Sequence, residues 1–176
     1  MNVCAQIAKI YDEFKSDVES LRKLDFKTHL KEALQLKEKI EKRWKHVFVG
    51  DEMSINDETL ICFGDIGDES VSKWKQMPKM LIVIEGKVDF EWATFEDTGN
   101  LRYVAGDASF MGSAIRYLTN LREIGGSVHF ENSEVERLGA LSEVGGNVGL
   151  NSWSWLTEAD FSKINVKGEI TTFTED

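Results

Sequence analysis

The chain of 176 residues is poor in the residues that build metal centres and disulfide frameworks, with only two cysteines and three histidines. Cys4 and Cys62 have neither a metal-ligand spacing nor enough partners for a disulfide framework, which favours a reduced, cytoplasmic protein. The sequence has no apolar run of about 18 residues and no basic-then-apolar leader after Met1. We therefore expect neither a membrane span nor a secretory signal.

Sequence motifs for catalysis are also missing. There is no Walker-type loop, no dinucleotide fingerprint and no nucleophile elbow. His29, His46 and His129 stand at no spacing typical of metal ligands. Gly125-Gly126 and Gly145-Gly146 could suggest phosphate loops, but no long helix follows either pair, which leaves structural turns as the better interpretation. We expect no enzymatic activity, no metal and no cofactor.

Charge is unevenly distributed along the chain, whose net charge is −10. Residues 1–50 carry 11 basic and 8 acidic side chains, whereas residues 51–176 carry 10 basic and 23 acidic ones. An acidic body repels nucleic acid and attracts basic surfaces, including those with which proteins hold nucleic acid. The same excess of acid could serve solubility alone.

The first 49 residues contain no glycine or proline, which suits long helices. One apolar stripe at helical spacing consists of Val3, Ile7, Ile10, Phe14, Val18 and Leu21. A second consists of Leu30, Ala33, Leu36, Ile40, Trp44 and Val47. The pattern predicts an α-helical hairpin over residues 1–49, with a short connection at 24–27 and Thr28 as the N-cap of its second helix.

The second half of the chain repeats with a period of 20 residues from Leu81 onward. The first column holds Leu81, Leu101, Leu121, Leu141 and Phe161. The fourth holds Ile84, Val104, Ile124, Val144 and Ile164. The eighth holds Val88, Ala108, Val128 and Val148, and the tenth holds Phe90, Phe110, Phe130, Leu150 and Ile170. The fifteenth holds Phe95, Ile115, Val135 and Trp155.

Each column has a physical reason in a stacked coil. Four rows have glycine at the sixth position, where the backbone must turn tightly or approach the next coil closely: Gly86, Gly106, Gly126 and Gly146. Apolar residues at the eighth and tenth positions alternate with polar ones, as in a strand with one face inward. One coil cannot bury its apolar face alone, so neighbouring coils must stack into a parallel sheet at about 4.8 Å per coil.

These columns resemble the leucine-rich repeat family, in its short, 20-residue Ile-Gly-Gly type known from bacterial and phage proteins. The resemblance covers residues 81–170 and implies a parallel-β solenoid that binds partners. It departs from the family's common pattern because the twelfth position reads Trp92, Gly112, Asn132 and Ser152, with no regular asparagine ladder. The curvature of the solenoid is therefore left open.

The fold class that we expect is α+β, in three segments: 1–49 the helical hairpin, 50–80 a linker and degenerate capping coil, and 81–176 the solenoid. In the capping coil, the residues that match the first, fourth, fifteenth and eighteenth columns are Leu60, Phe63, Trp74 and Met77. Gly67 and Glu69 interrupt its strand columns. This coil would join the helices to the array and cap its first sheet edge.

Candidate binding residues lie at the seventh, ninth and eleventh positions, which should point outward from the strands. Trp92 and Trp153 stand where other rows have small residues, and interfaces favour tryptophan. Trp155 occupies a core column and should be buried. The partner-binding residues predicted are Asp89, Glu91, Trp92, Asp107, Met111, His129, Glu131, Asn151 and Trp153.

The function expected is a non-enzymatic protein-binding module whose acidic repeat face engages a basic protein surface, without direct nucleic-acid or membrane binding. One alternative is a phage or mobile-element inhibitor of a nucleic-acid-binding host defence complex, similar in class to anti-CRISPR proteins. A second alternative is a structural protein that dimerises through its helical hairpin. The dimer interface would then centre on Phe14, Val18, Leu36 and Ile40.

Overall fold

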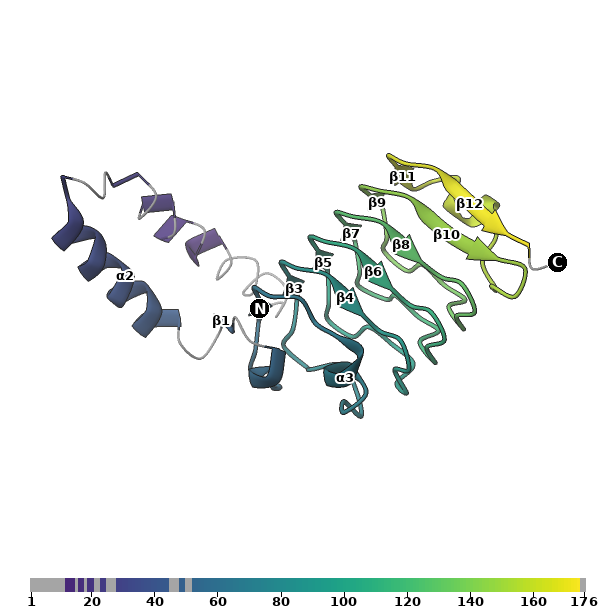
Figure 1. Ribbon diagram of the computed structural model, residues 1–176, viewed down its shortest axis with the longest axis horizontal. Helices are drawn as coiled ribbons and strands as arrows, with labels where there is room; N and C mark the ends of the chain where they lie inside the picture. The colour runs from purple at the N-terminus through teal and green to yellow at the C-terminus, as the bar shows by residue number, and fades with distance from the viewer. Residues whose placement is uncertain are drawn as a thin grey trace. The chain divides into compact units, whose positions relative to one another are not determined.

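The computed structural model describes residues 12–14, 16, 17, 19, 20, 23, 24, 28–44, 48, 49 and 52–174. The chain divides into two compact units, residues 1–45 and residues 46–176, which are described separately below. Figure 1 shows the helical first unit in purple and blue and the coils of the second unit from blue to yellow.

The first unit contains helix α2, Leu30–Trp44. It begins where the His29 carbonyl accepts a hydrogen bond from the Ala33 N–H at 2.9 Å, two residues after the predicted cap Thr28. Residues 12–14, 16, 17, 19 and 20 are also helical. Arg43 of α2 pairs with Glu13 at 2.8 Å and with Asp17 at 2.9 Å. The hairpin stays a prediction, because its connection and much of its first helix lie outside the described residues.

The second unit is a parallel β-solenoid of about six turns. Sheet A has the strand order β1-β2-β3-β5-β7-β9-β11 and sheet B the order β12-β10-β8-β6-β4. The strands of sheet A are β1 (Phe48–Val49), β2 (Ile61–Cys62), β3 (Val83–Ile84), β5 (Tyr103–Val104), β7 (Glu123–Ile124), β9 (Glu143–Val144) and β11 (Asn165–Val166). Those of sheet B are β4 (Val88–Asp89), β6 (Ala108–Ser109), β8 (Val128–His129), β10 (Val148–Asn151) and β12 (Ile170–Phe173).

Each central coil contributes one short strand to each sheet, and neighbouring coils lie in register at an offset of 20 residues. Val88 pairs with Ala108, Ala108 with Val128, and Val128 with Val148. Backbone hydrogen bonds run from coil to coil, so the donors and acceptors of one coil are satisfied by the next. One example is the bond of 2.8 Å from the Phe110 N–H to the His129 carbonyl. The 20-residue period predicted for the central rows is therefore present in the strand register.

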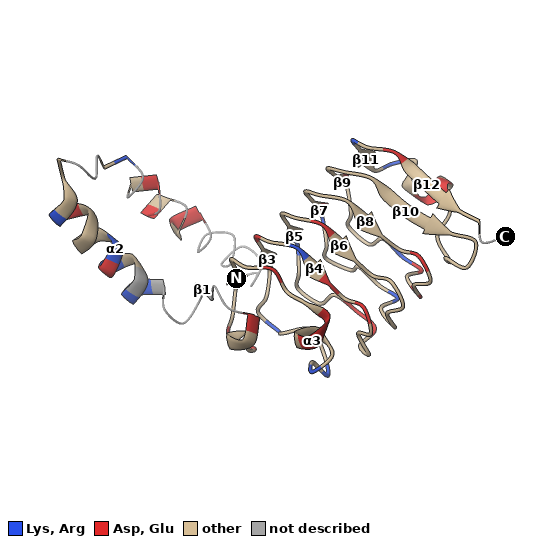
Figure 2. Ribbon diagram, in the orientation of Figure 1, with Lys and Arg blue, Asp and Glu red and all other residues tan. Residues whose placement is uncertain are grey.

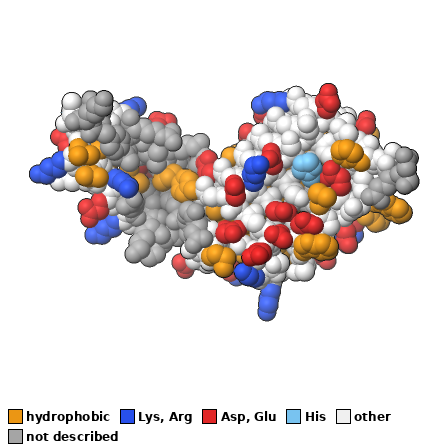
Figure 3. Space-filling model, in the orientation of Figure 1, with side chains coloured by type: hydrophobic (Ala, Val, Ile, Leu, Met, Phe, Trp, Pro, Cys, Tyr) orange, Lys and Arg blue, Asp and Glu red, His pale blue; other side chains and the backbone are white. Residues whose placement is uncertain are grey.

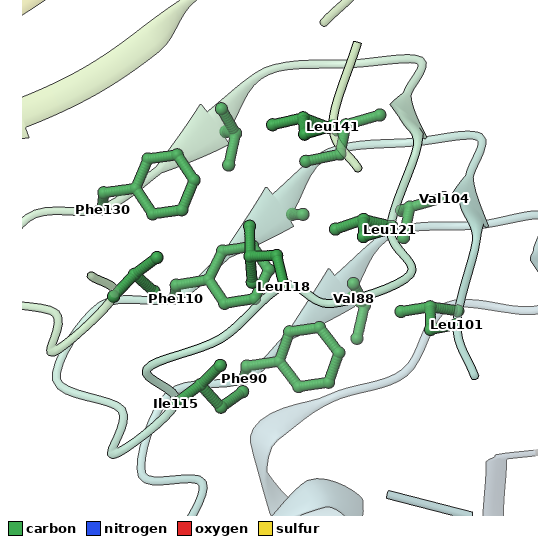
Figure 4. Close-up of a cluster of buried hydrophobic side chains, with 14 of the residues drawn as sticks. Val88, Phe90, Leu101, Val104, Phe110, Ile115, Leu118, Leu121, Phe130 and Leu141 are labelled. Carbon is green, nitrogen blue, oxygen red and sulfur yellow. The ribbon is translucent and has the colours of Figure 1, made fainter. Parts of the chain in front are cut away.

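The predicted columns form the core of the solenoid. Side chains at the first, fourth, eighth and tenth positions of the three rows spanning residues 81–140 are at most 2% exposed. The rings of Phe90, Phe110 and Phe130 stack, with centroids 5.1 and 5.3 Å apart (Figure 4). Burying one such ring stabilises the fold by roughly 1.5–3 kcal/mol, and each aromatic pair adds about 0.5–1.5 kcal/mol.

Glycine at the sixth position is required by the close approach of consecutive coils. A Cβ on Gly106 would lie 2.8 Å from the carbonyl oxygen of Gly86, closer than real Cβ atoms come to backbone. Of the two reasons predicted for this column, the structure shows the close approach: consecutive coils contact each other through their backbones at this corner.

The first coil has a different register from the one predicted. Cys62 pairs with Ile84 and Ile66 bridges to Val88, so this coil is offset by 22 residues. Cys62 is fully buried in the fourth column, whereas Phe63, which was predicted to fill it, is 43% exposed. Ile66 fills the eighth column, so the strand columns are not interrupted as Gly67 and Glu69 had suggested.

Short helical turns flank the first coil. The 3-10 helix η1 (Glu52–Ser54) precedes it within the predicted linker, and helix α3 (Asp68–Val71) follows the isolated bridge at Ile66. The Gly67 N–H donates to Glu52 Oε2 at 2.6 Å, which ties the start of α3 to η1. Trp74 is half-buried against the core and Met77 is buried within it, as their columns predicted.

The last coil also departs from the predicted columns. Strand β10 continues to Asn151, which delays the following turn by one residue. Leu156 is therefore buried, and Trp155, predicted in the core, is 69% exposed. After the 3-10 helix η2 (Glu158–Phe161), Val166 pairs with Val144 and Ile170 with Val148, again an offset of 22 residues. Ile164 and Ile170 were therefore assigned to the wrong columns.

Candidate interaction surface on sheet B

The outward face of sheet B carries the side chains of the seventh, ninth and eleventh positions, and we call it the sheet B face. Its charged side chains among the described residues are six carboxylates and one lysine: Asp65, Asp89, Glu91, Asp107, Glu131, Glu169 and Lys87. Figure 2 shows acidic residues along these coils and on α3. Figure 3 shows several acidic side chains on one face of the second unit, together with one histidine and a few hydrophobic side chains.

One ion pair neutralises part of this face. Lys87 Nζ lies 3.0 Å from Asp107 Oδ2, while Asp107 Oδ1 accepts a hydrogen bond of 2.9 Å from the Ser127 N–H. The Ser127 N–H and, after it, the Lys87 ammonium lower the pKa of Asp107, and Asp107 in turn raises the pKa of Lys87. Asp107 is therefore held as a structural anion and is less available to a partner than its sequence position suggests.

The seventh column forms a ladder of hydrogen bonds along the solenoid. Asp65 Oδ1 accepts from the Lys87 N–H at 2.8 Å, and Asp107 repeats the contact to Ser127. Ser127 Oγ then accepts from Asn147 N–H, and Asn147 Oδ1 from Glu169 N–H. A short acceptor at this position caps a backbone N–H of the next coil. The recurrence of Asp, Ser and Asn there was a signal in the sequence that the column analysis missed.

Asp89 and Glu91 are two carboxylates of this face that form no ion pair among the described residues, as are Asp65 and Glu169. Asp89 Oδ1 accepts a hydrogen bond of 2.9 Å from the Glu91 N–H, which fixes the start of the turn after β4. Within the described part of the chain, no lysine or arginine nitrogen lies within 4.0 Å of either carboxylate. These two anions therefore remain available to a cation from outside.

Two of the predicted binding residues are less accessible than their positions implied. Asn151 is only 6% exposed: its Oδ1 accepts from the Asn132 N–H, and its Nδ2 donates to Asn132 Oδ1 at 2.8 Å. The prediction that Asn151 points into solvent is wrong, because it bridges two turns. The Glu131 side chain is 13% exposed; Oε1 lies 3.3 Å from His129 Nδ1, and Oε2 is buried without a hydrogen-bond partner.

The turns that leave sheet B form one edge of this surface, which we call the turn edge. In the turns 90–93, 110–113 and 130–133 the third residue has a positive φ: 63° at Trp92, 60° at Gly112 and 55° at Asn132. A positive φ at the third position suits glycine and asparagine. Trp92 is thus the misfit in this column, and it is 63% exposed. Glycine and asparagine therefore stand in the twelfth column because this turn position has a positive φ.

Trp153 occupies the turn that follows β10, one coil before the end of the solenoid. Because β10 runs one residue further, this turn spans residues 151–154, with a hydrogen bond of 3.0 Å from the Ser154 N–H to the Asn151 carbonyl. Trp153 is its third residue, as Trp92 is in the first row, and it is 70% exposed. Met111, 37% exposed, lies on the same edge between them. The structure thus places both predicted tryptophans at the third residue of a turn, although the φ of Trp153, unlike that of Trp92, is not positive.

The residues predicted for a helical dimer interface lie in the first unit. Phe14 and Leu36 are half-buried and Ile40 is 8% exposed, whereas Val18 lies outside the described residues. Leu30 and Leu34 of α2 are 55% and 54% exposed. Of these two exposed leucines, Leu30 belongs to the predicted stripe and Leu34 does not, and neither was among the residues predicted for the interface.

Searches against known proteins add no assignment. No family model, curated protein or solved structure matches the chain. Among the described residues, no group of three or more His, Cys, Asp or Glu side chains is arranged to hold a metal ion, and no helix is both long and apolar enough to cross a bilayer.

Proposed function

We propose that the protein is a non-enzymatic binding module of the leucine-rich repeat type, and that its sheet B face engages a basic protein surface. The observation that carries the proposal is the pair of unpaired carboxylates, Asp89 and Glu91, on a face with six carboxylates and one lysine. Fields of one sign accelerate association with partners of the opposite sign, and this attraction weakens with salt.

Binding of an oligolysine peptide tests the proposal, with affinity and association rate measured by surface plasmon resonance at low and at physiological salt. The double variant Asp89→Asn/Glu91→Gln removes two charges and keeps the hydrogen-bond acceptor at residue 89. We expect it to slow association several-fold at low salt, and we expect this loss to shrink as salt is raised.

The matched control removes the same number of charges away from the sheet B face. Glu123→Gln/Glu134→Gln changes two exposed residues, the first on sheet A and the second beyond the turn edge. Equal losses for the two double variants would assign the attraction to net charge alone and overturn the proposal.

A second candidate function, self-association through the first unit, is favoured by the exposed Leu30 and Leu34 of α2. Two leucines at helical spacing form an apolar strip that a second copy could cover. Light scattering of the wild type and of Leu34→Glu decides this candidate. A monomeric wild type at micromolar concentration would exclude it.

A further inference from the structure

Burial in the core does not explain the two tryptophans of the turn edge. Trp92 and Trp153 are 63% and 70% exposed, so neither is buried in the core. At Trp92 the backbone also adopts φ of 63°, in the left-handed region that disfavours a residue other than glycine. Gly112 and Asn132 fill the equivalent turns with residues that tolerate this conformation. Trp92 is therefore exposed and in a disfavoured backbone conformation, whereas Trp153 is exposed without that strain.

Charge and aromatic surface meet at the same turn. Glu91 precedes Trp92 directly, and Asp89 is fixed beside it by its hydrogen bond to the Glu91 N–H. A cation over the face of a tryptophan is attracted to the ring, and nearby carboxylates add to that attraction. Arginine fits such a site better than lysine, because its planar guanidinium can stack on an indole and bind a carboxylate through two N–H groups.

We propose that Trp92 and Trp153 are paired anchors for arginine side chains of an extended basic segment that lies along the turn edge. This inference rests on the proposed function and deepens it, because it names the chemistry of the partner. The two turns are three coils apart, which is about 14 Å at about 4.8 Å per coil. An extended chain covers that distance in roughly four residues, so one short segment can reach both rings.

The experiment compares oligoarginine and oligolysine peptides of equal length, long enough to span both anchors. We expect wild-type protein to bind oligoarginine more tightly, and Trp92→Asn/Trp153→Asn to lose that preference. At about 0.5–1 kcal/mol per exposed cation–π contact, each tryptophan contributes roughly a two- to five-fold change in dissociation constant. Binding of oligolysine should change much less, since Asp89 and Glu91 remain.

The control variant is Trp155→Asn. Trp155 is 69% exposed, as much as Trp153, but it stands beyond the turn, next to the buried Leu156. It should leave the preference for oligoarginine unchanged.

Thermal denaturation provides a second readout. Trp92→Asn places asparagine in the conformation that Asn132 already adopts, so it should keep or raise the melting temperature while it weakens binding.

The outcomes separate the two proposals. If the wild type binds neither peptide, the proposed function fails and the anchors fail with it. If both peptides bind equally and the tryptophan variants change nothing, the anchors are refuted while the acidic face stands. A fall in melting temperature with Trp92→Asn would show that Trp92 serves the fold and would also overturn the inference.

Discussion

The stacked phenylalanines make the solenoid testable by a single substitution. Phe110 is fully buried, and its ring stacks on Phe90 at 5.1 Å and on Phe130 at 5.3 Å. Phe110→Ala removes both stacking contacts and leaves a cavity between two coils. Substitutions of this type cost about 3–5 kcal/mol, and loss of contacts on two sides places this one near 4–5 kcal/mol.

That cost is large beside the roughly 5–15 kcal/mol by which a domain is stable. In a solenoid each coil is supported only by its neighbours, so damage to a central coil should also uncouple the coils on either side. Urea denaturation, followed by far-UV circular dichroism, should show a lower midpoint and a broader transition. The melting temperature should fall in parallel.

Met111→Ala is the matched control, because Met111 is the next residue and is 37% exposed on the turn edge. It should change the free energy of unfolding by less than about 1 kcal/mol. Similar losses for Phe110→Ala and Met111→Ala would refute the inward position of the tenth column and the register of sheet B.

Two further predictions concern the first coil and the seventh-position ladder. In a Cys4→Ser background, Cys62 should react with a thiol reagent only as fast as the protein unfolds, because it is fully buried. The added thiol of Phe63→Cys should react at once. Fast labelling of Cys62 would contradict the 22-residue register. Since the pKa of Asp107 is lowered in the folded state, its stabilising effect is present above the ordinary pKa of about 3.9 and is lost as pH falls through the lowered value. Asp107→Asn, which keeps an acceptor for Ser127 but loses the charge, should therefore be less stable than the wild type at neutral pH, and a difference that stays constant down to about pH 2 would contradict the Lys87 pair.

The central coils could be predicted because apolar spacing and glycine placement constrain the same backbone. A residue such as Val128 must be apolar for the core, and Gly126 must lack a side chain for the close approach of coils, so both requirements recur every 20 residues. The end coils are different, because two additional residues fit between strands without breaking strand pairing. A fixed period therefore placed Phe63 and Trp155 in columns that Cys62 and Leu156 fill.

The ladder of the seventh column is less evident in the sequence, because its members share a role and not a residue type. Asp107, Ser127 and Asn147 all offer a short side-chain acceptor to the next coil. A second ladder runs at the twentieth position, where the Nδ2 groups of Asn100 and Asn120 each donate at 2.7 Å to a carbonyl one coil back. The asparagine ladder missing from the twelfth column is thus present, in two rungs, at another corner.

Alternation along a strand identifies which side chains point outward, but not which of them the fold already uses. Asp107 is held by Lys87 and Ser127, and Asn151 bridges two turns, although both occupy outward positions. Asp89 and Glu91 differ because neither forms an ion pair with a cation of the described residues. Trp92 differs because its positive φ favours glycine at that turn position. Selection for stability alone would place at position 92 a residue like those of the neighbouring turns. The presence of tryptophan there, beside two carboxylates without ion pairs, makes this corner of the solenoid the strongest candidate for contact with a partner.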